Sequence, residues 1–121
     1  MNLPTTFAEA ERFRESSRTR KLGNNTVLRW SEDEPGRERD WYAIRLHDTD
    51  VVTFYADGTI QLDSGGWKTV TTKDRMNKIL QPNGYTLYQQ DFEWFITRLP
   101  FSHNEPSPYY DGMVLQLEDN N

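Results

Sequence analysis

The segment from Ser64 to Arg75 combines residue types that could bind an anion. Adjacent glycines let a ligand approach the backbone, and free amides at the start of a following helix carry partial positive charge. The expected ligand-binding residues are Ser64, Gly65, Gly66, Trp67, Lys68, Thr71, Thr72, Lys73 and Arg75. Hydroxyls, cations and a stacking indole would suit a phosphate-bearing ligand such as a nucleotide or a nucleic-acid end. The GK[ST] signature of a Walker A loop is absent.

A structural interpretation of the same segment is simpler and takes precedence over binding. Two glycines make a sharp turn, Trp67 fills the core, and Thr71 or Thr72 caps a helix. Asp74 fits the capping pattern and would repel an anion.

His47, Asp48 and Asp50 form a second cluster, from which His47 and Asp50 are possible additional site residues. A turn between two strands could place His47 beside a carboxylate, as a general acid or base requires. With His103, the other histidine, and Lys73, it could support metal-free phosphodiester cleavage, as in a hydrolase or nuclease. The two aspartates more simply accept backbone amides in the turn.

Three other carboxylates invite a metal interpretation. Asp57, Asp63 and Asp111 have spacings that match no calcium loop, and Asp57 and Asp111 each precede a glycine in a turn. We therefore expect no metal and no cofactor.

Length and composition fit a single domain. The 121 residues can bury a core without disulfides or metal. The absence of cysteine excludes disulfides, cysteine zinc sites and a thiol nucleophile. With 4 Trp, 6 Tyr and 6 Phe, an aromatic-dominated core is expected.

The net charge of −5 is unevenly distributed. Residues 1–21 carry five basic and three acidic residues, and the remaining hundred carry nine basic and sixteen acidic. An acidic body argues against broad electrostatic binding to DNA or RNA, although it leaves room for a local basic site.

The pattern of apolar residues predicts mostly strands. A capping box beginning at Thr6 indicates a short helix over 7–17, and a second helix follows Thr71 or Thr72 to about Leu80. Alternating and β-branched segments predict strands at 26–30, 41–47, 51–55, 59–63, 85–89, 92–97 and 113–117. The Asp57–Gly58 pair marks the clearest hairpin turn. Residues 99–110, with three prolines, are expected to form a loop.

These elements predict an α+β fold, with a mainly antiparallel sheet of about six or seven strands and two short helices. The whole chain, 1–121, is expected to be one domain. A peripheral N-terminal helical segment (1–22) precedes a β-rich core (23–117) and a polar tail (118–121).

One stretch, 46–77, has a recognisable string of motifs. Leu46 to Phe54 reads LHDTDVVTF, and a DG turn, an SGGWKT loop and a TTKDRMN helix start follow. This string resembles an uncharacterised family of small tailed-bacteriophage proteins that share LHxTDVVTF, DG, SGGWxT and TTKxRxN motifs. The first forty residues lie outside the resemblance, which implies a phage origin rather than a particular chemistry.

The expected function is that of a non-enzymatic phage accessory protein that acts by binding, for host takeover or against a defence system. Two partner classes stay open: a phosphate-bearing ligand or nucleic acid at 64–75, and a host protein inhibited through acidic or aromatic surface. A small metal-free hydrolase or nuclease using His47 is the enzymatic alternative. Without a signal peptide or an apolar span, we expect no membrane partner and a place in the host cell cytoplasm.

Overall fold

The structure is a computed structural model that describes residues 1–14, 19–31, 41–100 and 104–117. Its helices are α1 (Phe7–Phe13) and α2 (Val70–Leu80), and a 3-10 helix (Gln81–Asn83) follows α2. Its strands are β1 (Thr19–Gly23), β2 (Thr26–Trp30), β3 (Trp41–Leu46), β4 (Thr49–Tyr55), β5 (Thr59–Leu62), β6 (Tyr85–Gln90), β7 (Glu93–Arg98), β8 (Ser107–Pro108) and β9 (Val114–Gln116).

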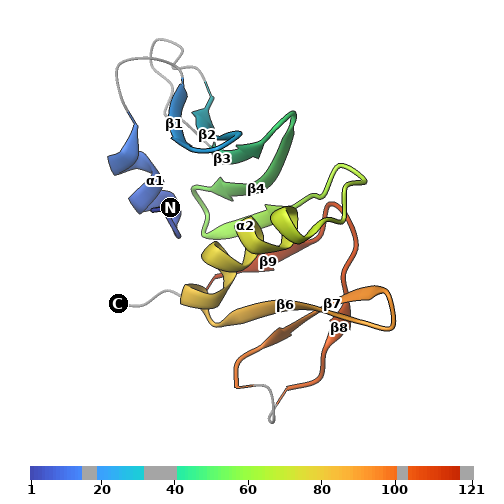
Figure 1. The fold of residues 1–121 in the computed structure, drawn as a ribbon. Coiled ribbons are helices and arrows are strands. Elements are labelled where there is room, and N and C mark those ends of the chain that lie inside the picture. The colour runs from blue at the N-terminus through green and yellow to red at the C-terminus, as the bar shows by residue number, and fades with distance from the viewer. Residues whose placement is uncertain (15–18, 32–40, 101–103, 118–121) are drawn as a thin grey trace.

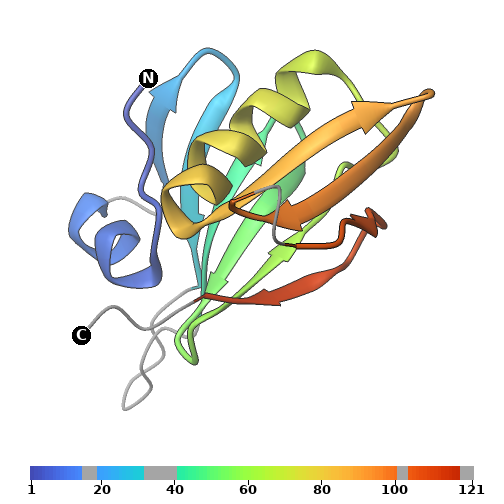
Figure 2. The same ribbon diagram turned by 90° about the horizontal axis from the view of Figure 1, so that it is seen from below.

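The strands form two antiparallel sheets. The larger has the order β1-β2-β3-β4-β5-β9, and the smaller has the order β6-β7-β8. Helix α2 lies between them, as Figure 1 shows, and Figure 2 shows α2 and the β6–β7 hairpin across the same face of the larger sheet. The buried residues of α2 recur on one side of the helix, so one core lies between that side, the larger sheet and the β6–β7 hairpin.

Strand alternation decides which side chains enter that core. Tyr42 pairs with Phe54 and Ile44 with Val52 across β3 and β4, and all four are at most 1% exposed. Helix α2 contributes Met76, Ile79 and Leu80, each fully buried. The register thus directs one face of the larger sheet toward α2.

Asn77 joins α2 to the smaller sheet through its side-chain amide. The Asn77 Nδ2 atom donates to the Leu87 carbonyl at 2.8 Å, and the Leu87 amide donates to Asn77 Oδ1 at 2.8 Å. The side chain therefore pairs with β6 as a neighbouring strand would, and it satisfies backbone groups that would otherwise face a helix.

The predicted fold class is confirmed: the chain is α+β, mostly antiparallel sheet, with two α-helices. The Asp57–Gly58 hairpin turn is also present, with Gly58 at φ +88° and the Asp57 carboxylate accepting from the Thr59 amide. Strands β1 and β8 were not predicted. Helix α1 ends at Phe13, whose carbonyl accepts a hydrogen bond from Arg20 of β1 at 2.7 Å. The predicted helix continued to residue 17, and its residues 15–17 lie outside the described part of the chain.

The predicted aromatic core is wrong. Among the described buried residues, aliphatic side chains outnumber aromatic ones. Aromatic residues such as Trp67, Phe92 and Tyr110 are instead 69%, 95% and 62% exposed. Aromatic content alone does not decide burial, because turns carry these rings away from the sheet faces.

Candidate functional site

The turn between β3 and β4 consists of His47 and Asp48. His47 has φ +53° and an exposed side chain, and its amide donates to the Asn25 carbonyl in the neighbouring β1–β2 turn at 2.8 Å. The Asp48 carbonyl accepts from Arg45 at 3.2 Å. These bonds fix the backbone of the turn and leave the imidazole and the Asp48 carboxylate at the surface.

The loop from Asp63 to Gly66 directs its amides toward the protein's own side chains. The Ser64 amide and hydroxyl each donate to Asp111 at 2.8 Å, and the Gly65 amide donates to Asp63 at 2.7 Å. The Gly66 amide donates to the Ser64 hydroxyl at 3.2 Å. The amides of both glycines, which were expected to allow close approach of a ligand, are thus bonded within the protein.

Helix α2 begins two or three residues earlier than predicted. Its N-cap is Thr69, whose hydroxyl accepts from the Thr72 amide at 3.1 Å, rather than Thr71 or Thr72. The hydroxyls of Thr69 and Thr72 also lie 3.0 Å apart. Thr69 can serve as the N-cap because its backbone is extended, the conformation that is typical of a helix N-cap.

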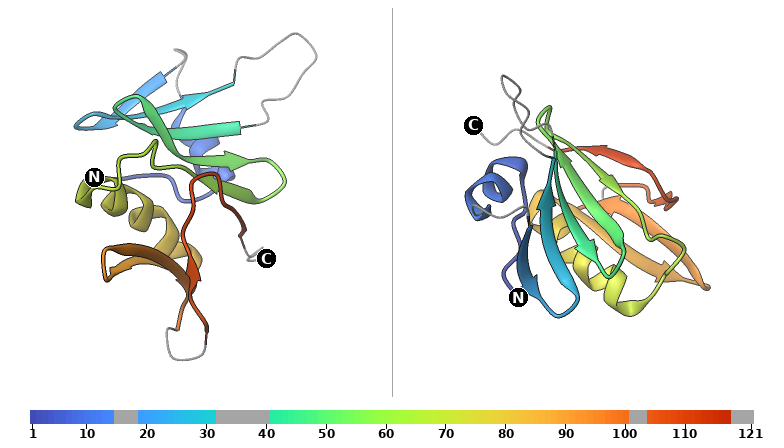
Figure 3. Two further views of the ribbon diagram at one scale, coloured as in Figure 1. Left: turned by 90° about the vertical axis from the view of Figure 1, so that its right-hand side faces the viewer. Right: turned by 90° about the horizontal axis from the view of Figure 1, so that it is seen from above.

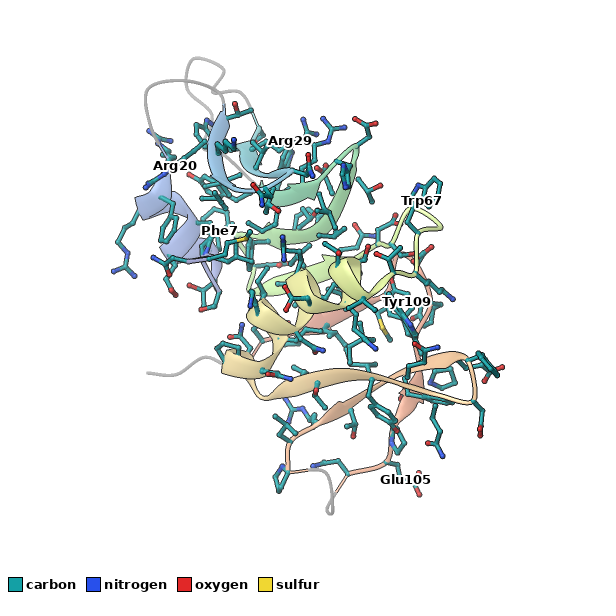
Figure 4. The ribbon with its side chains drawn as sticks, viewed as in Figure 1. Phe7, Arg20, Arg29, Trp67, Glu105 and Tyr109 are labelled. Carbon is teal, nitrogen blue, oxygen red and sulfur yellow. The ribbon has the colours of Figure 1, made fainter. Side chains whose placement is uncertain are left out.

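These three segments enclose one pocket. It has a volume of about 470 Å³, and its lining is Leu46, His47, Asp48, Thr49, Val51, Ser64, Trp67, Thr69, Thr71 and Thr72. Leu46 and Val51 are buried, whereas Trp67 is 69% exposed. Figure 4 shows Trp67 projecting from the loop that precedes α2, so it does not fill the core as the structural interpretation requires.

The pocket therefore unites residues that the sequence placed in two separate clusters. Ser64, Trp67, Thr71, Thr72 and His47 line it together. Sequence reasoning did not single out Leu46, Thr49, Val51 or Thr69. Alternation indicates Leu46 on the core face of β3, but it could not indicate Val51, which is the extra residue of a β-bulge beside buried Val52.

The predicted cations lie outside the lining. The Lys68 ammonium lies 5.7 Å from the centre of the Tyr109 ring, and Lys73 borders a shallow hollow on the outer side of α2. Arg75 is 13% exposed, and its Nε atom donates to the buried Thr26 hydroxyl of β2 at 3.0 Å. Arg75 thus connects α2 to the larger sheet.

The remaining predicted residues are also placed. Gly65 lies against Thr49, and Gly66 is exposed, but neither lines the pocket. Asp50 accepts from Arg29 at 3.0 and 3.2 Å and lies 3.8 Å from Arg45, on the side of the sheet away from α2. His103 falls outside the described residues.

Asp111 stabilises the loop that forms one wall. Burial acts to raise the pKa of the Asp111 carboxyl. Hydrogen bonds from Tyr109, Ser64 and Gly66 outweigh burial and lower the pKa below the ordinary value. Burial, and then the 2.6 Å bond to Asp111, raise the pKa of the Tyr109 hydroxyl, which stays protonated and donates. The described residues contain no group of three or more His, Asp or Glu side chains that could hold a metal.

Comparison with known protein families shows the origin of the chain. The model of a family described as Kyanoviridae Gp96 protein matches residues 8–116. The chain belongs to this family. Kyanoviridae Gp96 is a phage protein family, so the phage origin predicted from 46–77 is confirmed, whereas the motifs proposed to define it stay a prediction. The match also includes most of the first forty residues, which the resemblance left out.

Neither a curated protein nor a solved structure matches this Gp96-family chain. Among the described residues, the longest helix, α2, has 11 residues, and none has the length and apolar character of a membrane span. Function is therefore argued from the pocket and the surfaces themselves.

Proposed function

We propose that this phage protein acts by binding, with its ligand in the pocket beside Trp67. The observation that supports this is the Trp67 indole, which is 69% exposed at a cavity of about 470 Å³. Small-molecule sites have volumes of about 300–1,000 Å³. An indole so exposed contributes little to the core, but it offers a large stacking surface to a flat ligand.

The lining fits a planar ring with polar edges, such as a nucleobase. Buried Leu46 and Val51 provide an apolar floor. Thr71 provides a hydrogen-bonding hydroxyl at the start of α2, whereas the hydroxyls of Thr69 and Thr72 are bonded to each other. Stacking on an aromatic side chain contributes about 1–3 kcal/mol per base, so the ring would supply much of the affinity.

A phosphate on that ligand would contribute less than the sequence suggests. His47 and the first-turn amides of α2 are the groups nearest to such a charge. Lys73 and Arg75 point elsewhere, and the Asp48 carboxylate on the rim opposes an anion. The proposal is therefore a nucleoside-like ligand recognised by its ring. Capture of a signalling nucleotide would serve host takeover or the blocking of a defence system.

The test is a thermal-shift titration with matched pairs of nucleosides and nucleotides, and with cyclic dinucleotides. Ligand binding raises the unfolding temperature in proportion to occupancy of the folded state. Trp67→Ala should abolish the shift, whereas Phe92→Ala, which removes another exposed ring on the β6–β7 turn, should retain it.

The nucleoside pairs separate ring recognition from phosphate recognition. A shift with both members of a pair supports the ring, and a shift with the nucleotide alone supports a phosphate site. A shift of equal size in Trp67→Ala, or no shift with any ligand, would contradict the pocket proposal.

A second candidate function is a protein–protein blockade. Val70 is 80% exposed close to Trp67, and Tyr110 is 62% exposed. Exposed aromatic side chains such as Trp67 and Tyr110 are typical anchors of protein interfaces, and Val70 adds apolar surface beside Trp67. If no small ligand binds, a host protein whose capture is lost in Trp67→Ala and retained in Phe92→Ala would support this function instead.

A further inference from the structure

The larger sheet has a second face, opposite α2. No helix or strand among the described residues covers it, and Figure 3 shows α2 and the smaller sheet together on the other side. The register assigns the outward side chains, because partners of outward residues are outward on every strand. They include Lys21, Val27, Arg29, Trp41, Arg45, Thr53, Tyr55 and Gln61.

Two aromatic rings lie side by side on this face. Trp41 of β3 and Tyr55 of β4 are directly paired, and both are partly exposed. They border a shallow hollow of about 270 Å³ together with Asp50, Thr53 and Gln61. The hollow also reaches Asp63, so its floor carries carboxylates that can accept hydrogen bonds from a ligand.

Basic side chains continue the surface toward β1. The Arg29 guanidinium lies 4.9 Å from the centre of the Trp41 ring and donates to Asp50. Arg45 is the second cation near Asp50, at 3.8 Å, and Lys21 on the edge strand is exposed. Arg29, Arg45 and Lys21 carry one more charge than the two carboxylates of the hollow, which leaves a small positive charge on this part of a chain whose net charge is −5.

We propose that this outer face binds single-stranded nucleic acid. Tyr55 and Trp41 are partly exposed and can stack on unpaired bases, with the Arg29 guanidinium already over one side of the Trp41 ring. Cations beside the rings can contact the phosphates. The described residues of this face lie in strands, so no helix among them could enter a groove, and a duplex would present its bases to neither Trp41 nor Tyr55.

This inference does not rest on the pocket beside Trp67. The outer face lies on the other side of the larger sheet from α2, and Figure 4 shows Arg29 above that sheet and Trp67 on the loop before the helix. Variants of one surface therefore serve as controls for the other.

The test is fluorescence anisotropy of the full chain with labelled oligo-dT, oligo-U and a duplex, each of about 12 nucleotides, within the usual site size. Single strands should bind and the duplex should bind much more weakly. Affinity should fall steeply when salt rises from about 50 to 200 mM, because phosphate contacts release counterions. The DNA and RNA strands show which sugar is preferred.

Matched variants locate the surface. Lys21→Gln should weaken single-strand binding several-fold and reduce the slope of log affinity against log salt by about one, whereas Lys78→Gln on α2 should not. Tyr55→Ala should weaken binding roughly tenfold, in line with the loss of one stacking contact. Trp67→Ala should leave it unchanged.

Equal binding by wild type, Lys21→Gln and Tyr55→Ala would overturn the proposal, as would absence of single-strand binding at low salt. Equal affinity for duplex and single strand would also overturn it. If Tyr55→Ala fails to fold, Gln61→Glu places an extra negative charge at the hollow and should weaken binding by a similar factor. Binding lost only in Trp67→Ala would assign nucleic acid to the pocket instead.

Discussion

Neighbouring glycines in the loop before α2 have different surroundings. Gly65 has φ +62°, and a Cβ atom there would overlap the Thr49 side chain on β4. Gly66 has φ +84°, and a Cβ atom there would meet nothing within 4 Å. Both positions disfavour other residues, but only Gly65 is also held by packing.

Gly65→Ala should therefore destabilise the protein more than Gly66→Ala. The left-handed backbone costs an alanine about 1–2 kcal/mol at either position, and the contact with Thr49 adds to this at Gly65 alone. Urea unfolding measures the difference. Thr49→Ala should recover part of the loss in Gly65→Ala and none in Gly66→Ala; equal losses in the two glycine variants would contradict the packing role.

Asp111 should make stability depend on pH. Because its pKa is lowered on folding, the carboxylate stabilises the fold above its unfolded pKa and loses this effect as pH falls through the folded value. Asp111→Ala should lower the unfolding free energy by about 1–3 kcal/mol at pH 7, since Ser64 and Tyr109 lose their acceptor.

Urea unfolding at pH 7 and at about pH 3, below the ordinary aspartate pKa, checks this. The gap between wild type and Asp111→Ala should narrow at the lower pH. A gap that stays constant would show that the charge of Asp111 is not what stabilises the loop. Tyr110→Phe, which changes an exposed neighbour, provides the control.

At the scale of the elements, α2 is positioned by polar contacts at several points. Thr69 caps its first turn, Arg75 reaches Thr26 on β2, and Asn77 pairs with Leu87 on β6. Polar side chains thus fix the helix to both sheets, and one of them, Arg75, is of a type that also binds anionic ligands. This explains why a sequence motif around 64–77 mixes architectural and surface positions.

Arg75→Ala should lower the unfolding free energy by about 1 kcal/mol, the typical contribution of one hydrogen bond. Lys73→Ala, two residues away on the outer side of α2, should change it by less than about 0.5 kcal/mol. Thermal or urea unfolding distinguishes the two. If Arg75→Ala abolished ligand binding and left stability intact, the anion-site interpretation of Arg75 would be restored.

At the scale of the whole molecule, the larger sheet is bounded by short edge strands. Its central strands, β3 and β4, pair on both sides, β4 contacts α2, and Ile44 and Phe54 are fully buried. In the larger sheet, the edge strands β1 and β9 pair on one side only. In the smaller sheet, the edge strand β8 has only two residues. Stability should therefore decrease from the centre of the sheet outward.

Hydrogen exchange should show this gradient. Amides of β3 and β4 should exchange slowest, near the rate set by global unfolding, and amides of β1 and β8 should exchange faster. Measurement by mass spectrometry or NMR resolves the strands. Uniform protection from β1 to β9 would indicate that the edges unfold only with the core.

The sequence by itself determined the local elements and the fold class. Hairpin residues such as Asp57–Gly58, the cap at Thr6, and the alternation through Tyr42 and Ile44 act within a few residues, so they can be recognised without the rest of the chain. Strand β1 was not predicted because apolar and polar residues alternate only weakly along it. It forms by pairing with β2. Phage family membership was also available from the string at 46–77.

Only the tertiary structure decided which of the chemically suggestive residues lie together. Asp111 bonds Ser64 across 47 residues, and Arg75 bonds Thr26 across 49. These pairings depend on how α2 packs between two sheets, and no short-range pattern encodes that packing. The same packing brought His47 to the pocket with Trp67 and directed Lys73 away from it, because a helix can present only one side to a given pocket.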